Sequence, residues 1–198
     1  MAGNNWLASP RSEAAVDRIL DAAGELFARR PAASVGMNEI ARAAGCSRAT
    51  LYRYFENREA LYTAYVHREA YAVHHQLLES LEGIDDPRQR LVQALLTSLR
   101  LVRNNAALQS WFAAGTAPIG AEIAESSDVV KAMSAAFVVS LSPGDPDTDP
   151  EAVERKARWI VRVLTSLLLF PGRDDDDERR MTEEFLAPVV TPRDQATQ

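Results

Sequence analysis

The chain has 198 residues, of which 46% are hydrophobic, so it is long enough to bury a core in one or two domains. Its formal net charge of −6 argues against a protein that binds nucleic acid over its whole surface. The single cysteine excludes an internal disulfide and fits a reducing cytoplasm, which is the location we predict.

We expect neither a targeting segment nor a membrane span. Residues 1–10 lack the charged segment and apolar run of a signal peptide, and we expect them to form a loose arm. The most apolar stretch, residues 159–170, contains Arg162 and is too short to cross a bilayer. Because glycine and proline are few and alanine and leucine abundant, the composition favours an all-α fold.

The first predicted helix covers residues 12–29 and braces the segment that follows. Its apolar side chains recur at helical spacing, including Val16, Ile19, Leu20, Ala23, Leu26 and Phe27. Arg29, Arg30 and Pro31 end it, and a loop runs on to Gly36.

Two short helices joined by a glycine turn are predicted next. The first covers residues 38–44, and Gly45 can take the left-handed conformation that ends a helix. Ser47 suits the N-cap of the second, residues 48–54, which directs Leu51 inward. This order is typical of a helix-turn-helix, whose second helix enters the major groove of DNA.

Basic charge is concentrated on this segment. Residues 42–58 contain four arginines and one acid, Glu56, whereas the rest of the chain is acidic. Positive charge confined to one element favours local DNA contact and disfavours contact elsewhere.

Residues 40–62, IARAAGCSRATLYRYFENREALY, resemble the DNA-binding signature of TetR-family transcriptional regulators. Val35 and Gly36 stand where that family has hydroxyl side chains, and Arg58 stands where it favours lysine. The resemblance implies a three-helix DNA-binding domain, which we assign to residues 1–56. It also implies a larger helical domain, residues 57–198, that binds an effector and forms a homodimer.

The predicted DNA contacts lie on the second helix of the motif and just after it. Arginines suit guanine edges and phosphates, and hydroxyls and tyrosines suit phosphates or thymine methyl groups. Tyr52 and Tyr54 have an alternative in packing against the first helix, and Arg58 in being solvated. The predicted residues are Ser47, Arg48, Ala49, Thr50, Tyr52, Arg53, Tyr54 and Arg58.

Six further helices are predicted, which makes about nine in all. A proline-rich, acidic segment, residues 140–150, is predicted to be a disordered loop. The helices are expected over residues 57–82, 87–103, 106–114, 118–139, 151–170 and 174–187.

The resemblance implies an effector pocket beside the long helix that starts at residue 57. Apolar walls with few polar groups would suit a small, mostly hydrophobic ligand. Each candidate has the alternative of being a core residue. The candidates are Tyr71, His74, Trp111, Phe112, Met133, Phe137 and Trp159. We expect no cofactor, and no metal site at His67 and His74, because further ligands at suitable spacing are lacking.

The helix over residues 151–170 becomes apolar on nearly all sides, so it must be covered on all sides. We therefore expect it to form the subunit interface with the last helix. The predicted interface residues are Ile160, Val163, Leu164, Leu167, Leu168 and Phe185.

Together these observations predict a ligand-responsive transcriptional regulator. We expect a repressor whose homodimer binds a palindromic operator on double-stranded DNA and is released by a small effector. One alternative is a DNA-binding regulator without a small-molecule effector. Another is an all-α enzyme, although no glycine-rich phosphate loop, HExxH or GxSxG motif is present.

Overall fold

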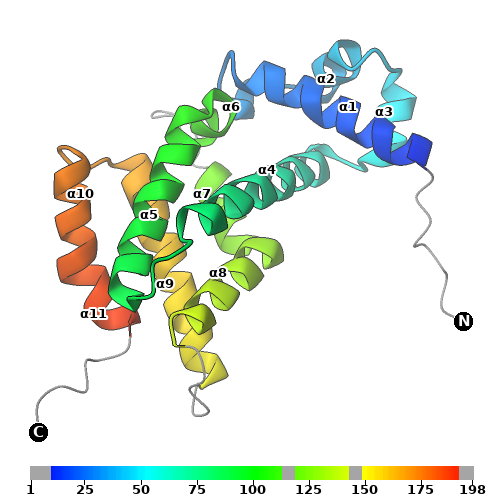
Figure 1. Ribbon diagram of the computed structural model, residues 1–198. Coiled ribbons are helices and arrows are strands. Elements are labelled where there is room, and N and C mark those ends of the chain that lie inside the picture. Colours follow the sequence, from blue (N-terminus) through cyan, green and yellow to red (C-terminus); the bar gives the residue numbers. More distant parts are fainter. Residues whose placement is uncertain (1–9, 113–118, 143–148, 192–198) are drawn as a thin grey trace, which may run out of the picture.

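The computed structural model describes residues 10–112, 119–142 and 149–191. Over these ranges the chain is built from helices and contains no strand, which confirms the predicted all-α class (Figure 1). Eleven α-helices are present in the described ranges, more than the nine expected, because two predicted helices are divided. The expected loose arm, residues 1–10, lies almost entirely outside the described residues.

The first three helices gather at one end of the molecule (Figure 1). They are α1 (Pro10–Phe27), α2 (Met37–Ala43) and α3 (Arg48–Tyr54), with a 3-10 turn at Ala32–Ser34. Their shared core is apolar and almost fully buried. It includes Ile19, Leu20, Ala23, Phe27, Val35, Ile40, Leu51 and Phe55.

Helix α4 (Arg58–Ser80) leads from this group into the body of the molecule (Figure 1). Asn57 caps it, because the Asn57 Oδ1 atom accepts a hydrogen bond of 2.8 Å from the Ala60 N–H. Its first turns belong to the core of the DNA-binding end, where Leu61, Tyr62 and Tyr65 are buried. That core therefore continues past residue 56, where we had placed the domain boundary.

The body begins with α5 (Pro87–Asn104) and α6 (Ala106–Gln109), followed by a 3-10 turn, Ser110–Phe112. Beyond residue 118 the expected single helix is wrong, since the structure has α7 (Ile119–Ser126) and α8 (Asp128–Ser140). Ser127 separates them. It caps α8, because its hydroxyl oxygen accepts a hydrogen bond of 3.2 Å from the Val130 N–H.

The C-terminal part consists of α9 (Pro150–Leu169), α10 (Asp175–Met181) and α11 (Ala187–Val190). A π-helical turn, Thr182–Leu186, joins α10 to α11 and divides what we had expected to be one helix. Most of the predicted loop, residues 143–148, lies outside the described residues. A second core forms where α5, α8, α9 and α11 meet, and it includes Leu95, Leu99, Phe137, Leu141, Leu167, Leu186 and Val190.

Candidate DNA-binding surface and effector cavity

Helices α2 and α3 form a helix-turn-helix with the expected turn. Gly45 has a φ of 64°, in the left-handed region that a Cβ atom disfavours. Ser47 caps α3, because its Oγ atom accepts a hydrogen bond of 3.0 Å from the Thr50 N–H. Leu51 is fully buried and fixes the inner side of α3 against the core. The opposite side of this short helix is consequently presented to solvent.

That outer side carries most of the predicted DNA contacts. Arg48, Ala49, Tyr52 and Arg53 are exposed, and each arginine lies over a tyrosine ring. The Arg48 guanidinium carbon is 5.3 Å from the Tyr52 ring centroid, at the range of a cation–π contact. Tyr54 is half-buried and packs against the core, which matches the alternative considered for it.

The loop before α2 is held by groups that sequence reasoning overlooked. The Tyr62 hydroxyl contacts the carbonyl oxygens of Ala32 and Val35, the latter at 3.0 Å. Val35 itself is fully buried, so it anchors the loop in the core. In the sequence, the apolar side chain of Val35 next to Gly36 was the feature that could have indicated this anchor.

Charged groups fasten the start of α2 and α4. The Glu39 carboxylate pairs with Arg30 and accepts a hydrogen bond of 3.1 Å from the Gly36 N–H. The Arg30 hydrogen bond is the main reason that the pKa of Glu39 lies below its ordinary value. Arg58 donates to the Ala33 carbonyl at 3.4 Å, so it borders the same surface while remaining exposed.

A cavity of about 190 Å³ lies in the body between α4, α5, α7, α8 and α9. Apolar side chains dominate its walls. On α4 they form one stripe, Val66, Ala70, Val73 and Leu77, whose spacing places them on the same face of the helix. The i, i+4, i+7, i+11 pattern of these residues was the sequence signal for them.

Five of the seven predicted effector contacts line this cavity. They are His74, Trp111, Phe112, Met133 and Phe137. Tyr71 and Trp159 do not line it and are 60% and 46% exposed, so the structure does not bring them to the cavity. Each lies one position from a residue that faces inward, Ala70 or Ile160, and one position is about 100° around a helix.

The predicted interface residues on α9 lie mostly inside the chain. Ile160, Leu164 and Leu168 line the cavity, Leu167 is buried, and Val163 packs partly buried against the second core. They are covered by α5 and α8 of the same chain, which explains why α9 is apolar on so many sides. Phe185 is 70% exposed, and other large apolar side chains in the segment from α9 to α11 are exposed as well. These are Trp159, Phe170, Met181 and Val189.

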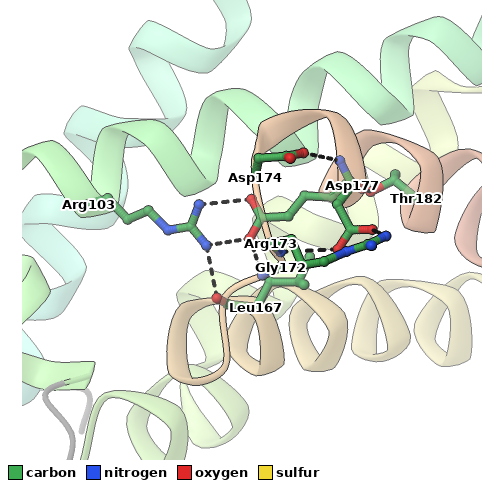
Figure 2. Close-up of polar contacts among 8 residues, drawn as sticks. Arg103, Leu167, Gly172, Arg173, Asp174, Asp177 and Thr182 are labelled. Carbon is green, nitrogen blue, oxygen red and sulfur yellow. Dashed lines mark hydrogen bonds and ion pairs between the residues drawn. The ribbon is translucent and has the colours of Figure 1, made fainter.

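A partly buried ion pair ties α5 to α10 (Figure 2). Arg103 donates to both carboxylate oxygens of Glu178, at 2.8 and 2.7 Å, and to the Leu167 carbonyl at 2.9 Å. The Gly172 N–H also donates to Glu178, at 2.9 Å. The Arg103 hydrogen bonds are the main cause of the lowered pKa of Glu178, and they outweigh the opposite effect of burial.

Neither a metal site nor a membrane span is found in the described part of the chain. No three His, Cys, Asp or Glu side chains there are grouped so as to hold a metal ion. None of the helices in those ranges combines the length and apolar character needed to cross a membrane.

Comparisons with known proteins agree with this geometry. Residues 19–65 match the model of the family described as bacterial regulatory proteins, tetR family. The chain is 56% identical over 192 residues to Rv1255c of Mycobacterium tuberculosis, described as an uncharacterized HTH-type transcriptional regulator. That alignment covers 97% of this chain and 93% of the relative.

Two solved structures share the fold at low sequence identity. One is the TetR family repressor AlkX from Dietzia, implicated in biodegradation of n-alkanes, with a TM-score of 0.64 and 22% identity. The alignment covers 95% of this chain and 97% of the AlkX chain. The other is the repressor FadR of Thermus thermophilus in complex with lauroyl-CoA, with a TM-score of 0.64 and 21% identity, covering 92% and 98%.

Proposed function

The chain belongs to the TetR family of bacterial regulatory proteins, and we propose that it is a ligand-responsive repressor that binds a palindromic operator as a homodimer. The exposed face of α3, with Arg48 and Arg53 held outward by the buried Leu51, is the observation that carries this proposal. A helix presented in this way enters the major groove, where arginine pairs with guanine.

Homodimerisation is supported by the exposed apolar side chains of α9 to α11. Soluble monomers rarely expose several large apolar side chains together, and such patches mark interaction sites. Trp159, Phe170 and Phe185 are 46%, 76% and 70% exposed. The helices α10 and α11 lie on the side of the molecule away from α3 (Figure 1). We propose that a second copy of the chain covers them, which would hold two α3 helices for one palindrome.

An effector in the cavity would act through α4. This helix lines the cavity with Val66, Val73 and Leu77 and contributes Leu61 and Tyr65 to the core of the DNA-binding end. The apolar walls suit a mostly hydrophobic ligand, and the named neighbours are a regulator of n-alkane degradation and one holding lauroyl-CoA. Release of DNA requires that this ligand bind more tightly to the state that cannot bind DNA.

Two experiments test the proposal. In a mobility-shift assay at moderate salt, the folded protein should shift DNA from upstream of its own gene in the presence of excess unrelated DNA. A complete lack of sequence-specific shift would contradict operator binding. In a thermal-shift screen, an apolar ligand that binds the cavity should raise Tm and should also release the DNA. DNA binding with no ligand response across the screen would instead favour a regulator without a small-molecule effector.

A further inference from the structure

Trp111 lies where the effector cavity meets the core of the DNA-binding end. Its indole lines the cavity, yet only 2% of the residue is exposed. It also packs with Phe27, Tyr62 and Tyr65, and these four rings form what we term the aromatic cluster. The ring-centroid distances from Trp111 are 5.1 Å to Phe27, 4.9 Å to Tyr62 and 5.8 Å to Tyr65.

Two members of the aromatic cluster hold the helix-turn-helix in place. Phe27 is the last residue of α1, and the Tyr62 hydroxyl fastens the loop before α2 through the Ala32 and Val35 carbonyls. Closely packed rings have little free space between them, so a shift of one ring repacks its neighbours. A displacement of Trp111 therefore also displaces the end of α1 and the loop before α2, the two elements that position α2 and α3.

The indole N–H of Trp111 has no acceptor among the described residues. A buried N–H without an acceptor raises the free energy of the conformation that contains it. The indole can only donate, and none of the cavity hydroxyls of Ser98, Ser134 and Thr165 accepts from it in this structure. An acceptor on a bound molecule would satisfy the Trp111 N–H.

The charged side chains near Trp111 favour one kind of hydrogen-bond acceptor on the ligand. Glu69 also lines the cavity and lies one helical turn after Tyr65, the ring on which Trp111 stacks. Arg68, the adjacent cation, already pairs with Asp21 at 2.8 Å and with Glu69 itself at 3.4 Å. A ligand carboxylate near Trp111 would have to compete with both acids for Arg68 while burying its charge among apolar walls, so a neutral oxygen is favoured.

We propose that Trp111 selects the effector and transmits its binding. Its indole N–H donates to a neutral carbonyl or ether oxygen on an otherwise apolar molecule. The Nε1 atom is covered in this structure, so an acceptor reaches it only when the ring shifts. That shift repacks Phe27 and Tyr62 and loosens the loop before α2. The assignment rests on the proposed function, because it specifies the effector and the route to the DNA-binding helices.

A matched ligand series tests the selection step. We would titrate the protein with 2-decanone, n-decane and decanoate, following the indole N–H resonances of the ¹⁵N-labelled native protein. The ketone should move the Trp111 resonance and bind about tenfold more tightly than the alkane, as one hydrogen bond would give. Equal affinity of ketone and alkane, tighter binding of decanoate, or no ketone binding would each overturn the proposal.

Substitutions locate the effect at this residue. Trp111→Phe keeps a ring but removes the N–H, and it should abolish the preference for the ketone. Tyr71→Phe is the control, because it keeps a ring and removes a hydrogen-bond donor at an exposed residue outside the cavity, and it should leave the preference unchanged. If Trp111→Phe still prefers the ketone, the assignment is overturned. If that variant does not fold, the resonance titration of the native protein still tests the selection step.

Tyr62→Phe tests the transmission step. It keeps the ring in the aromatic cluster but removes the hydroxyl that holds the loop. In the native protein, saturating ketone should weaken operator binding at least about tenfold, a usual size for coupling between two sites. Tyr62→Phe should bind the ketone normally yet show a much smaller loss. An undiminished loss would overturn transmission through Tyr62, whereas failure of the ligand-free native protein to bind the operator would contradict the proposed function instead.

Discussion

Arg48 and Arg53 are the residues whose loss should affect DNA binding most directly. Each guanidinium is exposed on α3, and a good arginine–guanine pair contributes about 1–3 kcal/mol of base discrimination. We expect Arg48→Ala to weaken operator binding about 5- to 150-fold and to relax the preference for one base pair. Fluorescence anisotropy with operator variants measures both. Arg155→Ala, an exposed arginine on α9, is the control and should bind as the native protein does.

Glu178 should matter for stability in a pH-dependent way. Its side chain is almost fully buried against Arg103, and breaking such a pair costs about 3 kcal/mol. We expect Glu178→Gln to lose about 2–3 kcal/mol in urea unfolding at neutral pH. Because pairing lowers the folded-state pKa of Glu178, this stabilisation is present above the ordinary carboxyl pKa. It disappears as the pH falls through the folded-state value.

The difference between native protein and Glu178→Gln should therefore shrink as the pH falls below the ordinary glutamate pKa of about 4.3, and it should vanish once the pH has passed the lowered folded-state pKa of Glu178. Glu125→Gln is the control, since the Glu125–Arg162 pair is exposed and should contribute little to stability. A difference that stays constant from neutral to acidic pH would show that the carboxylate charge is not responsible.

Residue placement was predictable from sequence only where a motif fixes it. The spacing from Ile40 to Phe55 placed Ser47 as a cap and Leu51 inward, and the structure agrees with both. Tyr71 and Trp159 were predicted to face the cavity because they are aromatic. The residue type alone does not show which side of a helix faces inward. The Arg103–Glu178 pair, 75 residues apart, left no local pattern to find.

Gly45 should be needed for the angle between α2 and α3. A Cβ atom there would meet no neighbour within 4 Å, so the cost of Gly45→Ala is backbone strain at φ 64°. We expect a loss of about 1–2 kcal/mol, together with weaker operator binding. Urea unfolding and anisotropy check the two effects. Gly45→Asn should lose less, because asparagine tolerates this conformation, and an equal loss would point away from strain.

The helices that follow Asn57 and Asp86 were predicted closely, whereas two divisions between helices were missed. Asn57 and Asp86 each accept a hydrogen bond from the first turn of the following helix, at 2.8 and 2.7 Å. The division at Ser127 was missed because apolar residues continue on both sides of it. The π-helical turn at Thr182–Leu186 was missed because its sequence is compatible with an ordinary helix.

At the scale of the whole molecule, the outer face of α9 to α11 should decide the oligomeric state. We expect Phe185→Glu to raise the dimer dissociation constant at least about tenfold, because a buried unpaired charge is costly. Sedimentation equilibrium measures this constant. Tyr71→Glu changes another exposed aromatic residue in the same way and should leave the dimer intact. A dimer that is weakened by Tyr71→Glu and not by Phe185→Glu would place the interface elsewhere.

The all-α class followed from composition and helical spacing, but the arrangement of the body did not. The walls of the cavity come from α4 to α9 and from the 3-10 turn Ser110–Phe112, and single-helix patterns do not show which faces meet. The same ambiguity led the inner residues of α9 to be assigned to a subunit interface. A helix apolar on most sides can be covered by its own chain on one side and by a second chain on the other.

The measurement that tests the account most directly is a hydroxyl-radical footprint on DNA upstream of the gene. Two α3 helices held by a homodimer should protect two half-sites related by two-fold symmetry. Protection should be lost in Arg48→Ala at a protein concentration at which Arg155→Ala still protects. Protection that is uniform along the DNA, or confined to a single half-site without symmetry, would contradict sequence-specific binding by a dimer through α3.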